Sequence, residues 1–354
     1  MHLININTLK NGLMLPGLLF LSLACDKSNP VINDNKPPCP GIVPTPPYNS
    51  PVWHPSGKFI GFNHAPLRRI TFPYGEHCTA VYELNGDSSG FWLINPDGTN
   101  QRRIFPYQLQ TPAWSPDGQW IAFVGNAQIY KMQFSGTMFD TTSLTQLTFE
   151  GRNFFPAWSP DGQWIAYDSN SESPNGMNFI WSMKADGSQK RRIAYEPMMG
   201  EIRMPHWSPD GQRIVHQRYV GVGAPEIFTM DISGSNPIRL TNDTRFDSRP
   251  QYSPDGTKIV FWSQTSTNGI GNLWKMNGDG SNLRQLTIES VDATFGLPFS
   301  WSPDGSAIAY TYYRVDERSN NNGTLWIIDI ATGKKRQLTL NQPSTNLELS
   351  ALRR

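Results

Sequence analysis

The sequence has few cysteines, no surplus of charge and no long hydrophobic run, and each shortage narrows the possible functions. Of its three cysteines, only Cys39 and Cys78 are candidate nucleophiles, and neither lies in a recognisable catalytic context. Lysine and arginine total 30 and acidic residues 29, for a net charge of +1. This balance gives no electrostatic reason to expect nucleic acid or an anionic membrane surface as a partner.

Charged residues make up only 17% of the chain, whereas glycine (30), proline (29) and tryptophan (12) are abundant. Such a composition is typical of many short strands joined by turns and argues against helices.

The most hydrophobic stretch, residues 12–23, is too short to span a bilayer as a helix. It follows a single cation, Lys10, and fits the apolar region of a secretory signal. Residues 21–25, Leu-Ser-Leu-Ala-Cys, resemble a bacterial lipoprotein signal, although Ser22 stands where leucine is commonest. We therefore expect residues 1–24 to be a lipoprotein signal peptide and Cys25 to carry the lipid. An ordinary cleaved signal with an incidental cysteine is the alternative.

A polar, proline-rich segment follows at residues 25–50, and we expect it to be a semi-extended tether. Cys39 in this tether and Cys78 beyond it remain as a candidate disulfide in an exported protein. Two free thiols are the alternative, because a sequence does not show whether their Cα atoms approach closely enough.

The rest of the chain is organised around a repeated Trp-Ser-Pro-Asp-Gly motif followed by a short apolar run. Five clear copies begin at Trp114, Trp158, Trp207, Tyr252 and Trp301, and a divergent copy begins at Trp53. Ser-Pro-Asp-Gly suits a tight turn, since proline presets φ, aspartate bonds nearby backbone and glycine tolerates the exit geometry. The segments on either side read as strands.

The motifs recur at intervals of 44 to 49 residues after a first interval of 61. This spacing predicts an all-β, six-bladed β-propeller of four-stranded antiparallel blades. We assign residues 51–340 to the propeller, with blades starting near residues 51, 112, 156, 205, 250 and 299. The longer first interval indicates an insertion, and residues 341–354 form a C-terminal tail. The tail either adds a strand or leaves blade six to pack on blade one.

The pattern of WSPDG, an apolar pair, a Trp- or Tyr-centred strand, DG and then RRI or RQLT resembles the WD40-like repeat of TolB-type propellers. The resemblance covers roughly residues 50 to 340. It implies the fold of the TolB C-terminal domain and an envelope-associated interaction. TolB has an additional α/β domain before its propeller, which has no counterpart here, so partners of that domain do not carry over. Related repeats form the gating propellers of prolyl oligopeptidase-like enzymes, which require an attached hydrolase domain.

The order of the strands within a blade places successive connections at opposite ends of the ring, which we call its two rims. The SPDG turns share one rim, whereas the links between blades and the second-to-third loops share the other, and these loops vary in sequence. Since function on repeat scaffolds tends to lie where the copies differ, we place the binding surface on the variable rim. The candidate binding residues are Thr111, Phe155, Met204, Arg245, Asp247, Arg249, Tyr312 and Arg314. The arginines suit a carboxylate or phosphate, and plain ion pairs are the alternative.

No catalytic or metal site is expected. Residues 86–90 match Gly-x-Ser-x-Gly, but a strand rather than a helix follows, so we interpret them as a polar turn. His64 and His77, with nearby Glu76 and Glu83, match no metal signature and are assigned to a solvated loop. His216 occupies a position held by aromatic residues in other copies and is expected in the core.

We therefore expect a non-enzymatic, exported lipoprotein without a cofactor, monomeric, with membrane contact only through its lipid. It would bind an envelope protein or a small ligand through the variable rim. The alternative is a saccharide-binding or carbohydrate-active propeller that uses aromatic side chains such as Phe155, Tyr312 and Tyr313 at the channel mouth.

Overall fold

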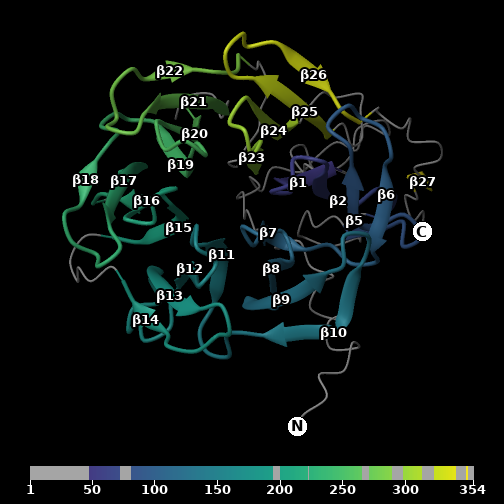
Figure 1. The fold of residues 1–354 in the computed structure, drawn as a ribbon, viewed down its shortest axis with the longest axis horizontal. Helices are drawn as coiled ribbons and strands as arrows, with labels where there is room; N and C mark the ends of the chain where they lie inside the picture. Colours follow the sequence, from purple (N-terminus) through teal and green to yellow (C-terminus); the bar gives the residue numbers. More distant parts are fainter. Residues whose placement is uncertain are drawn as a thin grey trace, which may run out of the picture.

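A computed structural model of the chain describes residues 48–71, 81–193, 200–221, 223–264, 271–288, 298–312, 323–339 and 348–349. The regular elements in these ranges are all strands. Six four-stranded antiparallel sheets follow one another around a ring in chain order (Figure 1). The predicted six-bladed propeller is confirmed.

The strands of the first three blades, from the innermost to the outermost, are β1 (Tyr48–Trp53), β2 (Ile60–His64), β5 (Gly90–Ile94) and β6 (Arg102–Phe105); β7 (Gln110–Trp114), β8 (Trp120–Gly125), β9 (Gln128–Phe134) and β10 (Phe139–Gln146); β11 (Asn153–Trp158), β12 (Trp164–Ser169), β13 (Phe179–Lys184) and β14 (Arg191–Arg192).

The strands of the last three blades are β15 (Ile202–Trp207), β16 (Arg213–Tyr219), β17 (Pro225–Asp231) and β18 (Ile238–Arg239); β19 (Phe246–Tyr252), β20 (Lys258–Gln264), β21 (Gly271–Asn277) and β22 (Arg284–Gln285); β23 (Phe299–Trp301), β24 (Ala307–Tyr312), β25 (Thr324–Asp329) and β26 (Lys335–Gln337).

Each blade is apolar on both faces because its strands alternate between two neighbours. In β8, Ile121 and Phe123 pack into the cluster shared with blade one, whereas Ala122 and Val124 pack into the cluster shared with blade three. Six such clusters fill the six interfaces between blades. The ring therefore has its core between the blades, which explains why a single blade would not be stable alone.

The SPDG turns join the first and second strands of blades two to six. In the turn of blade two, the Gly118 amide donates to the Ser115 carbonyl at 2.8 Å, and the Asp117 carboxylate accepts from the Ser115 hydroxyl and the Gln119 amide. The glycine has a φ of 69°, which L side chains rarely adopt. The sequence of the turn is thus explained by its own hydrogen bonds.

Among the described strands, the first and last blades exchange none where the ring closes. Blade one uses β1, β2, β5 and β6, and blade six uses β23 to β26. Their interface is the cluster that contains Phe62 and Leu325, and the Trp53 amide donates to the Ser300 hydroxyl at 2.9 Å. Blade six simply packs on blade one.

The insertion of blade one contains a hairpin of its own, β3 (Leu67–Thr71) and β4 (Val81–Leu84), outside the ring of blades. A short strand from the tail, β27 (Glu348–Leu349), pairs in parallel with β3. Both alternatives for the tail therefore hold in part, because the described residues of the tail, 348–349, add a strand to the insertion rather than to a blade.

Candidate functional site

The innermost strands of blades one to five start with the same distortion. A residue with positive φ precedes a proline, and the register with the second strand shifts there. We call these five the bulge residues: Ser50 (φ 53°), Thr111 (44°), Phe155 (52°), Met204 (57°) and Arg249 (53°). Blade six has Phe299 in place of the proline and pairs without a shift.

The proline that follows each of these residues has no N–H to donate to a strand ladder, and within sheets such prolines are found at bulges and edges. A β-bulge bends its strand and re-aims a side chain, and non-glycine residues at positive φ are strained by about 1–3 kcal/mol each. Five such residues in equivalent positions form a ring at the loop-side mouth of the channel, where the innermost strands begin. Four of the candidate binding residues, Thr111, Phe155, Met204 and Arg249, belong to this ring.

Contacts across the channel show where these side chains point. The guanidinium carbon of Arg249 lies over the Phe155 ring, 5.0 Å from its centroid. Arg249 belongs to blade five and Phe155 to blade three, so the two side chains meet past the blade between them. From that blade, Arg203 also lies over the ring at 5.9 Å. The guanidinium groups of Arg203 and Arg249 therefore both lie over the Phe155 ring.

The two arginines differ in their partners. Arg203 donates to the buried carboxylate of Asp168 at 2.9 Å, and Glu201 lies 3.9 Å away. Arg249 makes no hydrogen bond or ion pair with any described residue. Desolvation, together with the positive charge of Arg203, lowers the pKa of Arg249 to about 10, and Asp168 opposes the shift. Among the described residues, the carboxylate that attracts Arg249 is Asp168, which is already bonded to Arg203.

The other two charged residues predicted near Arg249 lie apart from it. Arg245 pairs with Asp243 at 2.5 Å and stacks on Trp274 at 3.9 Å. Asp247 is fully buried, and neither carboxylate oxygen makes a hydrogen bond. Burial raises the pKa of Asp247 to about 6, although the nearby Ser263 and Thr241 hydroxyls oppose the shift. Arg245 and Asp247 therefore have other surroundings than Arg249, which lies in the register shift that follows them.

Tyr312 lies at the end of β24 and packs against Trp326, with ring centroids 5.6 Å apart. It belongs to the apolar interface between blades five and six. Four further sequence-based candidates lie outside the described residues: Arg314, Tyr313, the predicted lipid anchor Cys25 and the candidate disulfide of Cys39 and Cys78.

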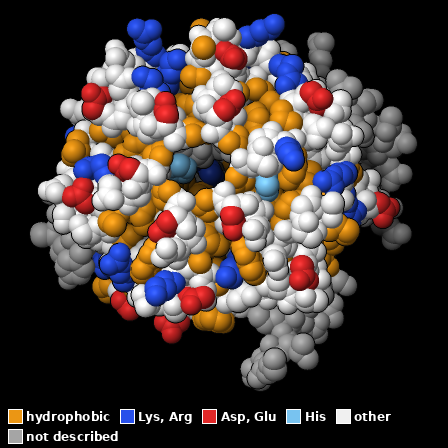
Figure 2. All heavy atoms as spheres, viewed as in Figure 1, with side chains coloured by type: hydrophobic (Ala, Val, Ile, Leu, Met, Phe, Trp, Pro, Cys, Tyr) orange, Lys and Arg blue, Asp and Glu red, His pale blue; other side chains and the backbone are white. Residues whose placement is uncertain are grey.

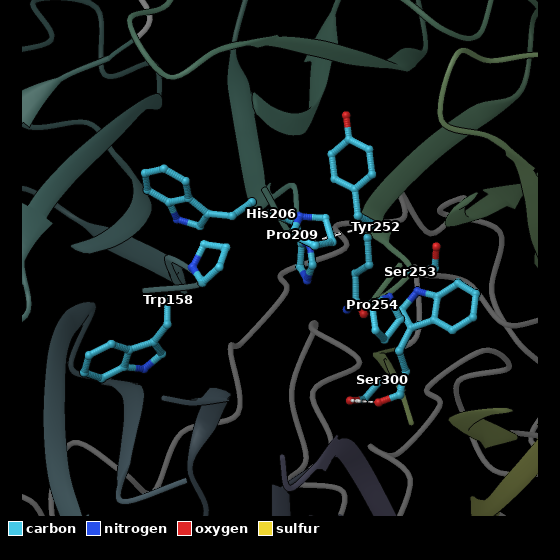
Figure 3. Close-up of a pocket in the computed structure, with 11 residues that line it drawn as sticks. Trp158, His206, Pro209, Tyr252, Ser253, Pro254 and Ser300 are labelled. Carbon is cyan, nitrogen blue, oxygen red and sulfur yellow. Dashed lines mark hydrogen bonds between the residues drawn. The ribbon is translucent and has the colours of Figure 1, made fainter. Parts of the chain in front are cut away.

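The SPDG end of the channel holds a pocket of about 250 Å³ that sequence reasoning did not predict. Figure 3 shows side chains from four consecutive blades converging on it, among them Trp158, His206, Tyr252 and Ser300. Figure 2 shows the central hollow of the ring surrounded by apolar side chains, with a basic side chain inside it. The sequence held a signal for this pocket, because the residue before the Trp or Tyr of each motif differs among most copies: Val52, Ala113, Ala157, His206, Gln251 and Ser300.

His206 is the titratable residue of this pocket. Its Nδ1 accepts a hydrogen bond from the Tyr252 amide at 3.3 Å, which links blades four and five. Burial lowers the pKa of His206 to about 4, so its imidazole is neutral at pH 7. The residue is therefore held as a hydrogen-bond acceptor between two blades.

The other sequence-based interpretations can be placed as follows. His216 is buried and stacks on Phe228, as expected. The assignment of His64 to a solvated loop is wrong, because His64 lies in β2 and stacks on Tyr48 at 4.5 Å. Residues 86–88 form the predicted turn. In the described ranges, no group of three or more His, Cys, Asp or Glu side chains is placed to bind a metal.

Among the same residues, no helix is long and apolar enough to cross a membrane.

Family comparison agrees with this architecture. A profile of the TolB beta propeller domain matches residues 103–221 and 196–348, which is well over half of the chain. The chain belongs to the TolB β-propeller family. TolB from Acinetobacter baumannii superposes with a TM-score of 0.59 at 22% identity, over 82% of this chain and 65% of that one. At this identity the likeness concerns the fold.

Two curated relatives match shorter stretches. An uncharacterized protein of Agrobacterium fabrum is 32% identical over 91 residues, which cover 26% of this chain and 29% of the relative. An oligogalacturonate lyase of Dickeya dadantii is 24% identical over 123 residues, 34% of this chain and 31% of the lyase. The chain therefore aligns with less than a third of either relative.

Proposed function

We propose that this TolB-family propeller is a non-enzymatic binding protein of the cell envelope, which holds a partner protein at the loop-side mouth of its channel. The supporting observation is the ring of bulge residues. Its backbone is the same in five blades, yet its side chains are serine, threonine, phenylalanine, methionine and arginine. Strain that recurs at one position is consistent with a functional constraint.

Export and lipidation of Cys25 belong to the same proposal. The motif at residues 21–25 and the proline-rich tether suggest a propeller held near a membrane surface by its first mature residue. The envelope partners expected from the family resemblance would then be within reach.

A carbohydrate-binding role is the competing candidate, supported by the short match to an oligogalacturonate lyase. The aromatic side chains named for it favour this role less in the structure. Two guanidinium groups lie over the Phe155 ring, and Tyr312 packs against Trp326. We therefore prefer a protein partner.

Site-specific photo-crosslinking tests the proposal. A benzophenone side chain at Met204, on the loop-side mouth, should give one defined protein adduct in the source envelope. The same group at Pro209, beside the SPDG pocket, is the matched control and should give no such adduct. An adduct from Pro209 alone, or none from either position, would contradict the proposal.

Once the partner is known, Phe155→Ala should weaken its binding while leaving the melting temperature nearly unchanged. Phe155 is only partly buried, so its truncation removes channel contacts rather than core packing. Equal affinity of the variant and the wild type would place the interface elsewhere.

A further inference from the structure

The bulge residue of blade five, Arg249, is a cation that makes no hydrogen bond or ion pair with a described residue. Arg203 beside it is held by Asp168, with Glu201 nearby. Arg249 has neither an ion pair nor a hydrogen bond of this kind, and its guanidinium lies over the Phe155 ring. A desolvated charge without a partner is costly, and an incoming anion would remove that cost.

From these contacts we infer that Arg249 and Phe155 form a binding site for a carboxylate, supplied by an acidic side chain of a peptide segment that enters the loop-side mouth. The inference rests on the proposed function and specifies the chemistry of its partner.

The charge around Arg249 favours a single carboxylate over a phosphate. Arg203 and Arg249 carry two positive charges against the two negative charges of Asp168 and Glu201, so the four groups together are neutral and a monoanion adds the smallest surplus of charge. A dianionic phosphate would leave the site with excess negative charge beside two carboxylates.

The surroundings of Arg249 favour a peptide over a sugar acid. The bulge residues beside it include Met204 and Phe155, whose side chains suit apolar neighbours of the acidic residue. A sugar acid would instead need an uncovered aromatic face, and both Arg203 and Arg249 lie over Phe155.

Nuclear magnetic resonance of the full propeller tests the site directly. The Nε–Hε signal of Arg249 is assigned by its loss in Arg249→Lys. The probes are two capped peptides, Gly-Phe-Glu-Gly and Gly-Phe-Gln-Gly, together with digalacturonate and inorganic phosphate. We expect the glutamate peptide to shift the Arg249 signal saturably, and the glutamine peptide to bind at least about 30-fold more weakly.

Arg249→Ala and Arg249→Lys should lose the same binding, since lysine lacks the fork that pairs with both oxygens. Arg284→Ala, on the outermost strand of the same blade, removes an equal charge and should bind normally. Equal binding of both peptides, or tighter binding of digalacturonate or phosphate, would overturn the inference. So would normal peptide binding by a folded Arg249→Ala.

The crosslink from Met204 separates this inference from the proposed function. A Met204 adduct that persists in Arg249→Ala at wild-type yield would refute the carboxylate site and leave the proposed function standing. If the propeller with benzophenone at Met204 gave no adduct while Arg249 was intact, the proposed function would be refuted.

Discussion

In the SPDG turns at one end of the channel, backbone and side chains both repeat. At the loop end, the backbone repeats and the side chains differ. The serine, aspartate and glycine of each SPDG turn bond within that turn, so their repetition serves folding. The bulge residues keep one strained conformation while their chemistry changes from blade to blade. We therefore expect recognition at the bulge residues, where the backbone conformation repeats and the side chains differ.

The largest effect should come from a glycine of an SPDG turn. A Cβ on Gly118 would lie 2.5 Å from the buried His54 ring, and the φ of 69° adds strain. We expect Gly118→Ala to lower the free energy of unfolding by about 3 kcal/mol. Denaturant titration measures this change.

Gly162→Ala is the matched control, because it has the same φ of 69° but meets only Pro116, at 3.6 Å. Its cost should be about 1 kcal/mol. Equal costs would mean that His54 moves aside and that the two turns are equivalent in packing.

The aspartates at the two ends should respond to pH in opposite ways. Hydrogen bonds from Ser159 and Ser208 lower the pKa of Asp161 and Asp210. Their contribution is present at neutral pH and is lost as the pH falls below about 4. Burial raises the pKa of Asp247 to about 6, so its contribution is present at low pH and is lost as the pH rises through about 6.

Asp247→Asn should therefore stabilise the protein at pH 7 by on the order of 1–2 kcal/mol and flatten the stability profile between about pH 4 and 6. Melting temperatures across that range measure the effect, with Asp161→Asn as the control that should destabilise at pH 7. A less stable Asp247→Asn variant at neutral pH would show that the ionised carboxylate makes a stabilising contact.

The smallest effect is expected at a bulge. Thr111 is β-branched at a φ of 44°, and its buried hydroxyl makes no hydrogen bond. Thr111→Gly should relieve strain without losing a bond, so stability should stay constant or rise by up to about 1 kcal/mol. Denaturant titration of this variant beside Gly162→Ala compares the two ends directly. A clear loss of stability would show that the bulge residues also serve folding.

Much of the fold follows from the sequence because each blade encodes its own turns and strands locally. The position of the bulge residues along the channel also followed, since each precedes the Trp or Tyr of its motif by three residues.

What the sequence could not show depends on the register between strands and on contacts between distant blades. Arg245, Asp247 and Arg249 alternate as if they shared one face, but the bulge after Ser248 separates Arg249 from the other two. The burial of His64 depends on stacking with Tyr48, and the pairing of β27 with β3 joins segments almost the whole chain apart. No local pattern reports such contacts.

The way the ring closes has a consequence for the order of the blades along the chain. In the described ranges, each blade is built from one continuous stretch of chain, and blades one and six share no strand. The chain could therefore begin at a different blade while the order of the blades around the ring stays the same. A circular permutant that joins residues 339 and 48 through a linker and opens between two other blades would keep every interface between blades. Any link between blades could then hold the chain termini, and the same channel could be presented to a membrane from a different point on its circumference.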